Sequence, residues 1–182
     1  MWLSTPAYQI ADVQHSSYVI IFNMAAKTFS FGRILLQPSV VFFRSTLSIA
    51  FVNRKPVLPG HVLVSPIRVV KRFCDLTEEE VADLFTSTQK IARIIEKEYG
   101  ATSLSIAIQD GPEAGQTVEH VHVHVLPRKK GDFEHNDDVY RALDEHDKQQ
   151  IEQESSNRHK GFRSEEDMSK EAARLASHFQ ML

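Results

Sequence analysis

The chain has 182 residues, of which 42% are hydrophobic and 25% are charged. This composition excludes a fibrous or wholly disordered protein, and the length is sufficient for one domain with a hydrophobic core. The formal net charge of −3 excludes the strong positive field with which proteins hold polymeric nucleic acid, although a local basic cluster can still bind a small anion. The single cysteine, Cys74, cannot form an internal disulfide.

Residues 1–28 show no periodic pattern of apolar residues and include a second methionine, Met24. We expect them to be a flexible N-terminal extension, and residues 29–182 to form the domain. No apolar run approaches the length of a membrane span, so no membrane partner is expected. The expected compartment is the cytoplasm, with the nucleus and the mitochondria as alternatives.

Several short segments are typical of β-strands. Residues 40–43, 48–52 and 61–64 are rich in β-branched and aromatic residues, and turn-forming residues separate them. Residues 104–108 and 119–126 alternate between apolar and polar side chains, as half-buried strands do. These patterns predict a sheet that is largely antiparallel.

One long helix is predicted to begin after Thr77, which forms a capping box with Glu80, and to end near Gly100. A C-terminal helix is predicted to begin near Ser164. The segment 134–162 is polar and partly flexible, with a short helix from residue 137 to about 146. This order of elements predicts an α+β fold. The apolar stripe of the long helix comprises Val81, Leu84, Phe85, Ile91, Ala92 and Ile95, and that of the C-terminal helix comprises Met168, Ala172, Leu175 and Phe179.

Three histidines, His120, His122 and His124, alternate with valines within the predicted strand 119–126. Because side chains alternate between the two faces of a strand, we expect the histidines on one face and the valines on the other, in the core. A chance stripe of solvated histidines explains such regularity poorly. The pattern therefore indicates a chemical site.

Two kinds of chemistry suit these histidines. A metal site could use two of them with His61, since the outer two lie roughly 13 Å apart along a strand and cannot share one ion. Alternatively, one neutral imidazole could attack phosphorus and form a covalent intermediate, while its neighbours orient it and donate a proton. The preceding loop favours the second interpretation, because Gly115 allows close approach of a ligand and Gln116 and Thr117 suit phosphate oxygens.

Residues 115–128, Gly-Gln-Thr-Val-Glu-His-Val-His-Val-His-Val-Leu-Pro-Arg, resemble the histidine triad superfamily. Residues 53–64, 80–85, 109–116 and 163–166 resemble its fragile histidine triad branch, which hydrolyses diadenosine triphosphate. The resemblance extends from about residue 29 to 180. It implies the histidine triad fold and a homodimer in which the long helix and the sheet continue across the subunits.

The resemblance further implies that diadenosine triphosphate is cleaved to AMP and ADP through a covalent nucleotidyl-histidine. His122 would attack the α-phosphate, and His124 would contact the phosphate oxygens and assist the leaving group, while His120 and His61 supply supporting hydrogen bonds. A magnesium or manganese ion would accompany the substrate, with no metal ligands from the protein and no tightly bound organic cofactor. Substrate-binding residues would be Asn53 at the ribose and Gln109, Gly115, Gln116, Thr117 and Val118 at the phosphates.

Two positions depart from the branch: Ile34 replaces a histidine near the base, and Glu119 replaces a lysine before the triad. Both concern substrate preference. His124 favours hydrolysis, because the transferase branch has glutamine there. Three alternatives stay open: a nucleoside phosphoramidase, a zinc-dependent hydrolase using His61, and a nucleotide-binding signalling protein. For the last, the resemblance implies a tumour-suppressor-like, pro-apoptotic role of the substrate-bound form, with protein partners that the sequence does not name.

Overall fold

The structure, a computed structural model, describes residues 28–145 and 162–179. The predicted extension, apart from residue 28, lies outside the described residues. So do residues 146–161 of the polar segment.

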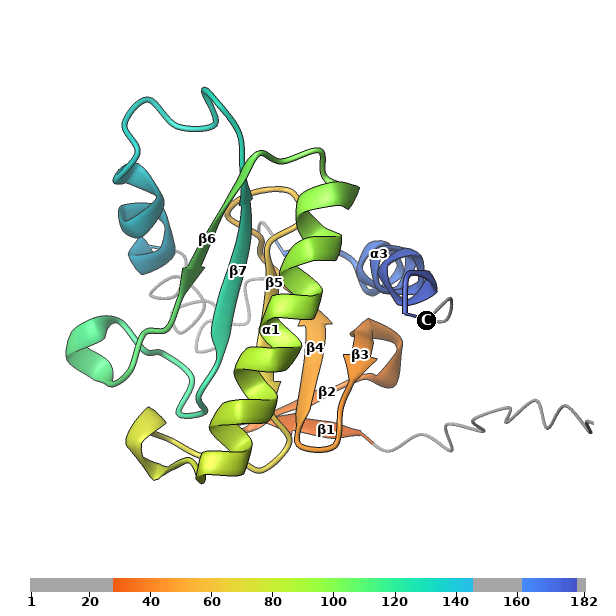
Figure 1. Ribbon diagram of the computed structural model, residues 1–182, viewed down its shortest axis with the longest axis vertical. Coiled ribbons are helices and arrows are strands. Elements are labelled where there is room, and N and C mark those ends of the chain that lie inside the picture. The colour runs from red at the N-terminus through yellow and green to blue at the C-terminus, as the bar shows by residue number, and fades with distance from the viewer. Residues whose placement is uncertain (1–27, 146–161, 180–182) are drawn as a thin grey trace, which may run out of the picture.

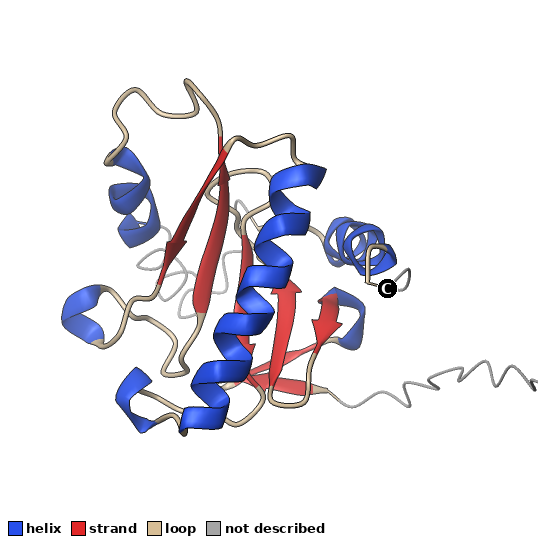
Figure 2. Ribbon diagram, viewed as in Figure 1, coloured by secondary structure: helices blue, strands red, loops and turns tan. Residues whose placement is uncertain are grey.

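Within the described residues, five strands form one antiparallel sheet in the order β3-β4-β5-β7-β6 (Figures 1 and 2). The predicted antiparallel sheet is thereby confirmed. Four of the five predicted strands lie within two residues of an observed strand at both ends, whereas the one predicted at 119–126 begins four residues later. Strand β6 lies at one edge, next to β7. The strands are β3 (Val41–Arg44), β4 (Ser48–Val52), β5 (Val62–Pro66), β6 (Ser103–Ala107) and β7 (Val123–Arg128).

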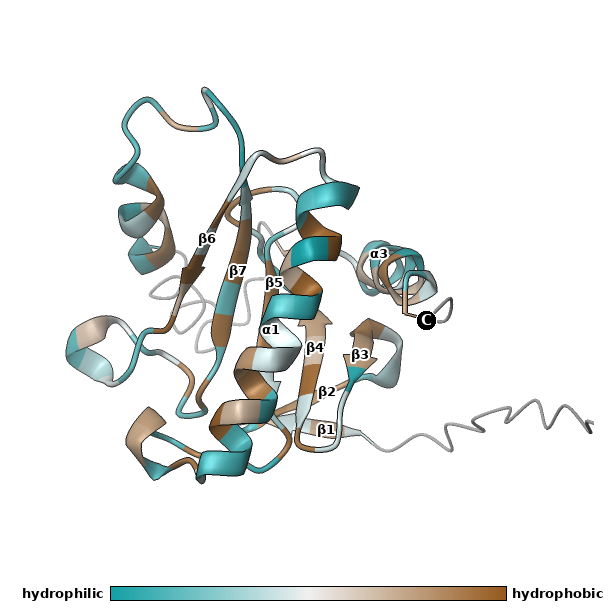
Figure 3. Cartoon of the chain, in the orientation of Figure 1, coloured by the Kyte–Doolittle hydropathy of each residue, from teal (hydrophilic) through white to brown (hydrophobic). Residues whose placement is uncertain are grey.

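The long helix α1 (Glu78–Glu98) covers one face of the sheet. The predicted capping box is present, because Thr77 Oγ1 accepts from the backbone N–H of Glu80 and Glu80 Oε2 accepts from that of Thr77. Hydrophilic and hydrophobic residues alternate along the helix (Figure 3), so that one side is apolar. That side is buried through Leu84, Ile91, Ala92 and Ile95.

Phe85 does not belong to this buried side, contrary to the prediction. Its side chain is 43% exposed and lies edge-on to the ring of Phe73, at 6.1 Å between centroids. Leu84 already occupies the sheet-facing position of that turn, and neighbouring residues on a helix point about 100° apart. Although α1 is long, no helix in the described ranges is apolar enough to cross a membrane.

The C-terminal helix α3 (Glu165–Ser177) begins as predicted, with Ser164 accepting a hydrogen bond from the backbone N–H of Asp167. Ala172 and Leu175 are buried, and Met168 and Phe179 pack against the same core. The helix contacts β3, β4 and the short 3-10 helix η1 (Pro38–Val40). Residues 138–145 are also helical, as predicted for the start of the polar segment.

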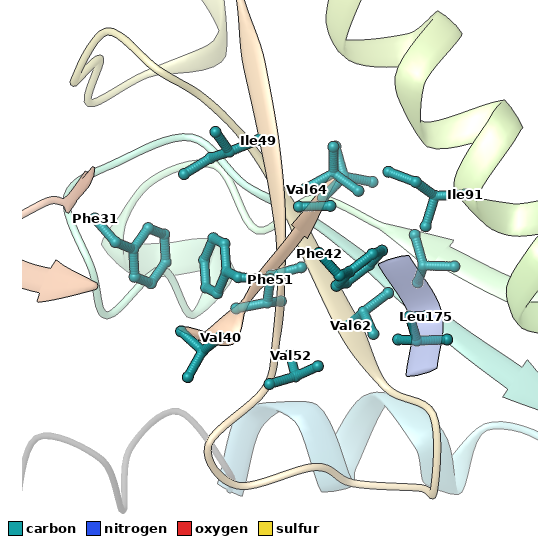
Figure 4. Packing of buried hydrophobic residues seen from close by; sticks show 14 of the residues in the cluster. Phe31, Val40, Phe42, Ile49, Phe51, Val52, Val62, Val64, Ile91 and Leu175 are labelled. Atoms are coloured by element: carbon teal, nitrogen blue, oxygen red, sulfur yellow. The ribbon is translucent and has the colours of Figure 1, made fainter. Parts of the chain in front are cut away.

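A hairpin of β1 (Phe29–Phe31) and β2 (Ile34–Leu36) was not predicted. Its turn is tight, because Gly32 adopts a φ of 58°. The ring of Phe31 packs edge-on against Phe51 of β4, whereas Ile91 of α1 lies on the other side of the sheet (Figure 4). The hairpin therefore covers the face that α1 leaves open.

Removing the N-cap side chain of α1 with Thr77→Ala should lower the free energy of unfolding by about 1 kcal/mol, because the backbone N–H of Glu80 loses its acceptor. Thr86→Ala is the matched control, since Thr86 is exposed in the same helix and alanine is the better helix former. Urea unfolding at neutral pH measures both. Equal stabilities of the two variants would contradict the role assigned to the cap.

Candidate active site

The sheet register brings two histidines from distant segments together. Leu63 of β5 pairs with His124 of β7, and His61 lies two residues before Leu63, hence on the same face. The His61 ring therefore reaches His124 diagonally, and its Nε2 lies 2.9 Å from His124 Nδ1. Both side chains are 1% exposed, so this contact is shielded from solvent.

The hydrogen bonds fix which nitrogen of each ring carries the proton. The backbone N–H of Val57 donates to His61 Nδ1 at 3.2 Å, so this nitrogen must be an acceptor. Neutral His61 then carries its proton on Nε2 and donates it to His124 Nδ1. His124 in turn carries its proton on Nε2. The result is a directed chain from Val57 through His61 to His124, which leaves His124 able to donate from its far side.

His122 has the opposite orientation. Its Nδ1 lies 2.7 Å from the backbone carbonyl oxygen of His120, and a carbonyl can only accept. His122 therefore donates from Nδ1, and the lone pair of the neutral ring is on Nε2. The ring stands edge-on to His124 at 4.8 Å and to Phe31 at 5.1 Å between centroids. A nucleophilic nitrogen and a proton donor thus lie side by side.

His120 is a fully buried supporting residue. Its Nδ1 accepts from the backbone N–H of Gly32 at 3.1 Å, and its Nε2 donates to the carbonyl of Arg68 at 3.1 Å. Burial lowers the pKa of His120 from 6.5 to about 4, so the ring is neutral near pH 7. The hairpin turn is thereby tied to the residue whose carbonyl orients His122.

The three histidines do not form one row on a strand, contrary to the prediction. Strand β7 begins only at Val123, and His120 and His122 precede it. The backbone N–H of Val121 donates instead to Val70, which draws this segment away from the sheet ladder. Only the valines lie as expected, in the core.

The predicted substrate-binding residues fall into two groups. Asn53 is buried, and its Nδ2 lies 3.4 Å from both ring nitrogens of His61, so it belongs to the histidine cluster. The loop residues are engaged locally: Gln109 Nε2 donates to Asp144, and Gln116 bonds to Gly111 and to Lys71. Gly115, Thr117 and Val118 are half-buried in the same loop. Their contact with phosphate stays a prediction.

Next to the histidines lies a cavity of about 290 Å³ with mainly apolar walls. Phe31 is shared, since it lines the cavity and touches the rings of His120 and His122. Most of these walls were not predicted. The alternation Phe-Ser-Phe before Gly32 could have signalled the hairpin, which supplies Phe31, Ile34, Leu35 and Leu36 to the lining. The lining includes Phe31, Ile34, Leu36, Val40, Phe51, Asn53, Leu63, Phe162 and Met168.

Ile34 and Glu119, the two positions that depart from the fragile histidine triad branch, lie in different parts of the structure. Ile34 lines this cavity. Glu119 lies outside it, largely exposed, and forms an ion pair with Lys71 at 3.0 Å. Only the first can therefore touch a ligand in the cavity.

The model of the HIT domain family matches residues 36–131, which is more than half of the chain. The chain belongs to the HIT domain family. A bifunctional bis(5'-adenosyl)-triphosphatase/adenylylsulfatase of Arabidopsis thaliana is 47% identical over 86% of this chain and 87% of its own length. A bis(5'-adenosyl)-triphosphatase of Dictyostelium discoideum is 48% identical over 82% and 92%, respectively.

A solved structure of a diadenosine triphosphate hydrolase of Plasmodium falciparum, in complex with cyclomarin A, has a TM-score of 0.68 to this chain. It is 32% identical, and the match covers 87% of this chain and 88% of that one. The fold is thus the HIT fold. The hairpin and α3, which line the cavity from two sides, lie mostly outside the matched residues 36–131.

The histidine cluster of this HIT domain is arranged as hydrogen-bonded imidazoles, not as the open set of three ligands that the zinc site considered above would use. His61 Nε2 and His124 Nδ1 face each other in a hydrogen bond, whereas ligands of one ion must both point at it. Across residues 28–145 and 162–179, no group of three or more histidine, cysteine or acidic side chains is placed to hold a metal. The geometry instead matches a chain of oriented imidazoles.

Because His120 is buried and neutral, the free energy of unfolding should decrease as the pH is lowered from 6.5 to about 4. In this window the unfolded chain protonates His120 while the folded chain resists, so protons favour unfolding by up to roughly 3 kcal/mol at the acid end. Urea unfolding should show that the free energy of unfolding decreases less between pH 7 and pH 4.5 in His120→Gln than in wild type. His135→Gln, at an exposed position, is the control. Parallel curves for wild type and His120→Gln would contradict the prediction.

Proposed function

We propose that this protein hydrolyses diadenosine triphosphate to AMP and ADP through a covalent bond between AMP and His122. The observation that carries the proposal is the pair of opposite ring orientations: His122 presents a lone pair on Nε2, and His124 beside it presents an N–H. The relatives named for this activity support the substrate.

In the first step, His122 Nε2 attacks the α-phosphorus, and the bond from phosphorus to the bridging oxygen breaks. The Nε2–H of His124 donates a hydrogen bond to that oxygen and stabilises the negative charge that develops there, and ADP leaves. In the second step, a water molecule attacks the same phosphorus, the phosphorus–nitrogen bond breaks, and the proton of the water passes to solvent. AMP is released and both histidines return to their starting states.

The hydrogen bond from His122 Nδ1 to the carbonyl of His120 suits both steps, because it stabilises the positive charge that the ring gains when its Nε2 bonds to phosphorus. The apolar cavity would hold the adenine, with the ribose at Asn53. The phosphates would lie along the loop that contains Gln109, Gly115, Gln116, Thr117 and Val118. A magnesium or manganese ion would arrive as part of the polyphosphate substrate.

A second substrate is adenylyl sulfate, on the strength of the activity in the name of the Arabidopsis relative. It shares the AMP half of diadenosine triphosphate, so the same cavity and the same nucleophile would serve. Only the leaving group differs. Nucleoside phosphoramidates share the AMP half as well, and competition between the three substrates would rank them.

Replacing the nucleophile by His122→Asn should abolish hydrolysis of diadenosine triphosphate while nucleotide binding persists, because asparagine fills the site without a reactive nitrogen. Intact-protein mass spectrometry after quenching in alkaline denaturant, where phosphoramidates survive, should show an AMP adduct on wild type only. His135→Asn, at an exposed histidine, should behave as wild type. Full turnover by His122→Asn would refute the proposal.

We also propose that two copies form a dimer through the edge strand β6. Ile106 on this strand is 48% exposed although the alternation of the strand is that of a half-buried one. An uncovered edge offers unpaired backbone groups to a second strand. A second copy of β6 would pair with them and bury Ile106.

Introducing a charge at this edge with Ile106→Arg should shift the protein from dimer to monomer, because an arginine cannot be buried there without a partner. Sedimentation velocity measures the shift. Ala173→Arg, at an exposed position on α3, is the matched control and should stay dimeric. A monomeric wild type, or a dimeric Ile106→Arg, would contradict the interface.

A further inference from the structure

The ring of Tyr99 packs directly on the backbone that leads into His61. Tyr99 is the C-cap residue of α1, and Gly60 immediately precedes His61. A Cβ atom added to Gly60 would lie 2.6 to 2.7 Å from three atoms of the Tyr99 ring. Gly60 also has a φ of 87°, which residues with a side chain rarely adopt. The ring and the glycine thus determine where this stretch of backbone lies.

The same stretch sets the orientation of His61. Residues 53–60 form the loop that carries Val57, whose N–H donates to His61 Nδ1. The backbone N–H of His61 donates to the carbonyl of Leu58 at 3.0 Å within this loop. A displacement of the loop would therefore move both the imidazole of His61 and the donor that fixes its tautomer.

Tyr99 is itself held from the side of α3. Its hydroxyl donates to Glu171 and accepts from Arg174 Nη2 at 3.0 Å. Burial and the Glu171 carboxylate raise the pKa of Tyr99, so the hydroxyl stays a donor. Figure 1 shows the end of α1 next to α3, where these contacts are made.

The start of the loop is anchored to the same cluster. Arg163 forms an ion pair with Glu171, and its backbone N–H donates to the carbonyl of Arg54 at 3.0 Å. Arg54 lies next to Asn53, at the beginning of the loop. Both ends of the loop are therefore attached to one cluster of Tyr99, Arg163 and Glu171.

We propose that Tyr99 is a positioning residue for the hydrogen-bond donor: its ring, held by Glu171, fixes the loop 53–60 so that His61 orients His124 towards the leaving group. Tyr99 touches no reacting atom in this proposal and acts only through Gly60, His61 and His124. The proposal rests on the function proposed above. It assigns α3 a part in catalysis, although Arg163 and Glu171 lie beyond the matched residues 36–131.

Two substrates with different leaving groups distinguish the positioning role of Tyr99 from a merely structural one. ADP leaves through a phosphate oxygen whose pKa is near 6, so its departure is aided by a hydrogen bond from the Nε2–H of His124. Sulfate, which leaves from adenylyl sulfate, is the anion of a strong acid and needs no such aid. Displacement of His124 should therefore slow the first substrate much more than the second.

The test compares Tyr99→Leu, which removes the ring, with Tyr99→Phe, which keeps it. We expect Tyr99→Leu to lower kcat for diadenosine triphosphate by about 10- to 100-fold, somewhat less than the loss when a hydrogen-bond donor to a developing charge is removed outright. Its kcat for adenylyl sulfate and both KM values should change by less than about 3-fold, and Tyr99→Phe should restore near-normal rates. Glu171→Ala, with Lys170→Ala as the control on the exposed side of α3, should show a smaller loss of the same kind.

Nitrogen-15 NMR of the histidine rings gives a second readout that needs no substrate. In wild type, His61 and His124 should each show one tautomer protonated on Nε2, and Tyr99→Leu should show mixed tautomers. Equal slowing of both substrates, or unchanged tautomers, would overturn the proposal. If Tyr99→Leu does not fold, the same rates and tautomers measured on Glu171→Ala test the proposal. If wild type does not cleave adenylyl sulfate, the tautomers alone test it. A wild type that cleaves neither substrate would refute the proposed function instead.

Discussion

The hydrogen bond between His61 and His124 is the interaction on which the site depends. Two neutral imidazoles can share a proton in either direction, and the N–H of Val57 makes the direction unique. Because both rings are buried, bulk solvent has little access to these nitrogens. The N–H of His124 is thereby presented beside the lone pair of His122, an arrangement suited to stabilising a leaving oxygen next to a nucleophile.

The second constraint is the neutrality of His120. The backbone around His120 suits a neutral ring: the N–H of Gly32 donates to Nδ1, and the carbonyl of Arg68 accepts from Nε2. Burial also opposes protonation of this ring. A charged His120 would lose the bond from Gly32 and would place a positive charge near His122. The bond from the hairpin turn to His120 therefore depends on the neutral state of this ring.

The cavity and the histidine cluster meet at Phe31, but they have different origins in the chain. The cluster lies within the matched residues 36–131, whereas the cavity walls come partly from the hairpin before them and from α3 after them. A sheet with one face covered by α1 leaves the other face open. The two flanking segments close that face and shape a mainly apolar cavity beside the polar histidine cluster.

The sequence by itself predicted most of the elements and the candidate reacting residues, because periodicity, the capping box and the alternating histidines are local patterns. It did not reveal that β7 starts after His122, since a hydrogen bond from Val121 to Val70 decides that. Nor did it reveal the exposure of Phe85 or the hairpin at residues 29–36. Ring orientations, cavity walls and the contact of Tyr99 with Gly60 join residues far apart in the chain. Only the tertiary structure decided them, because hydrogen-bond direction and packing depend on which groups meet in space.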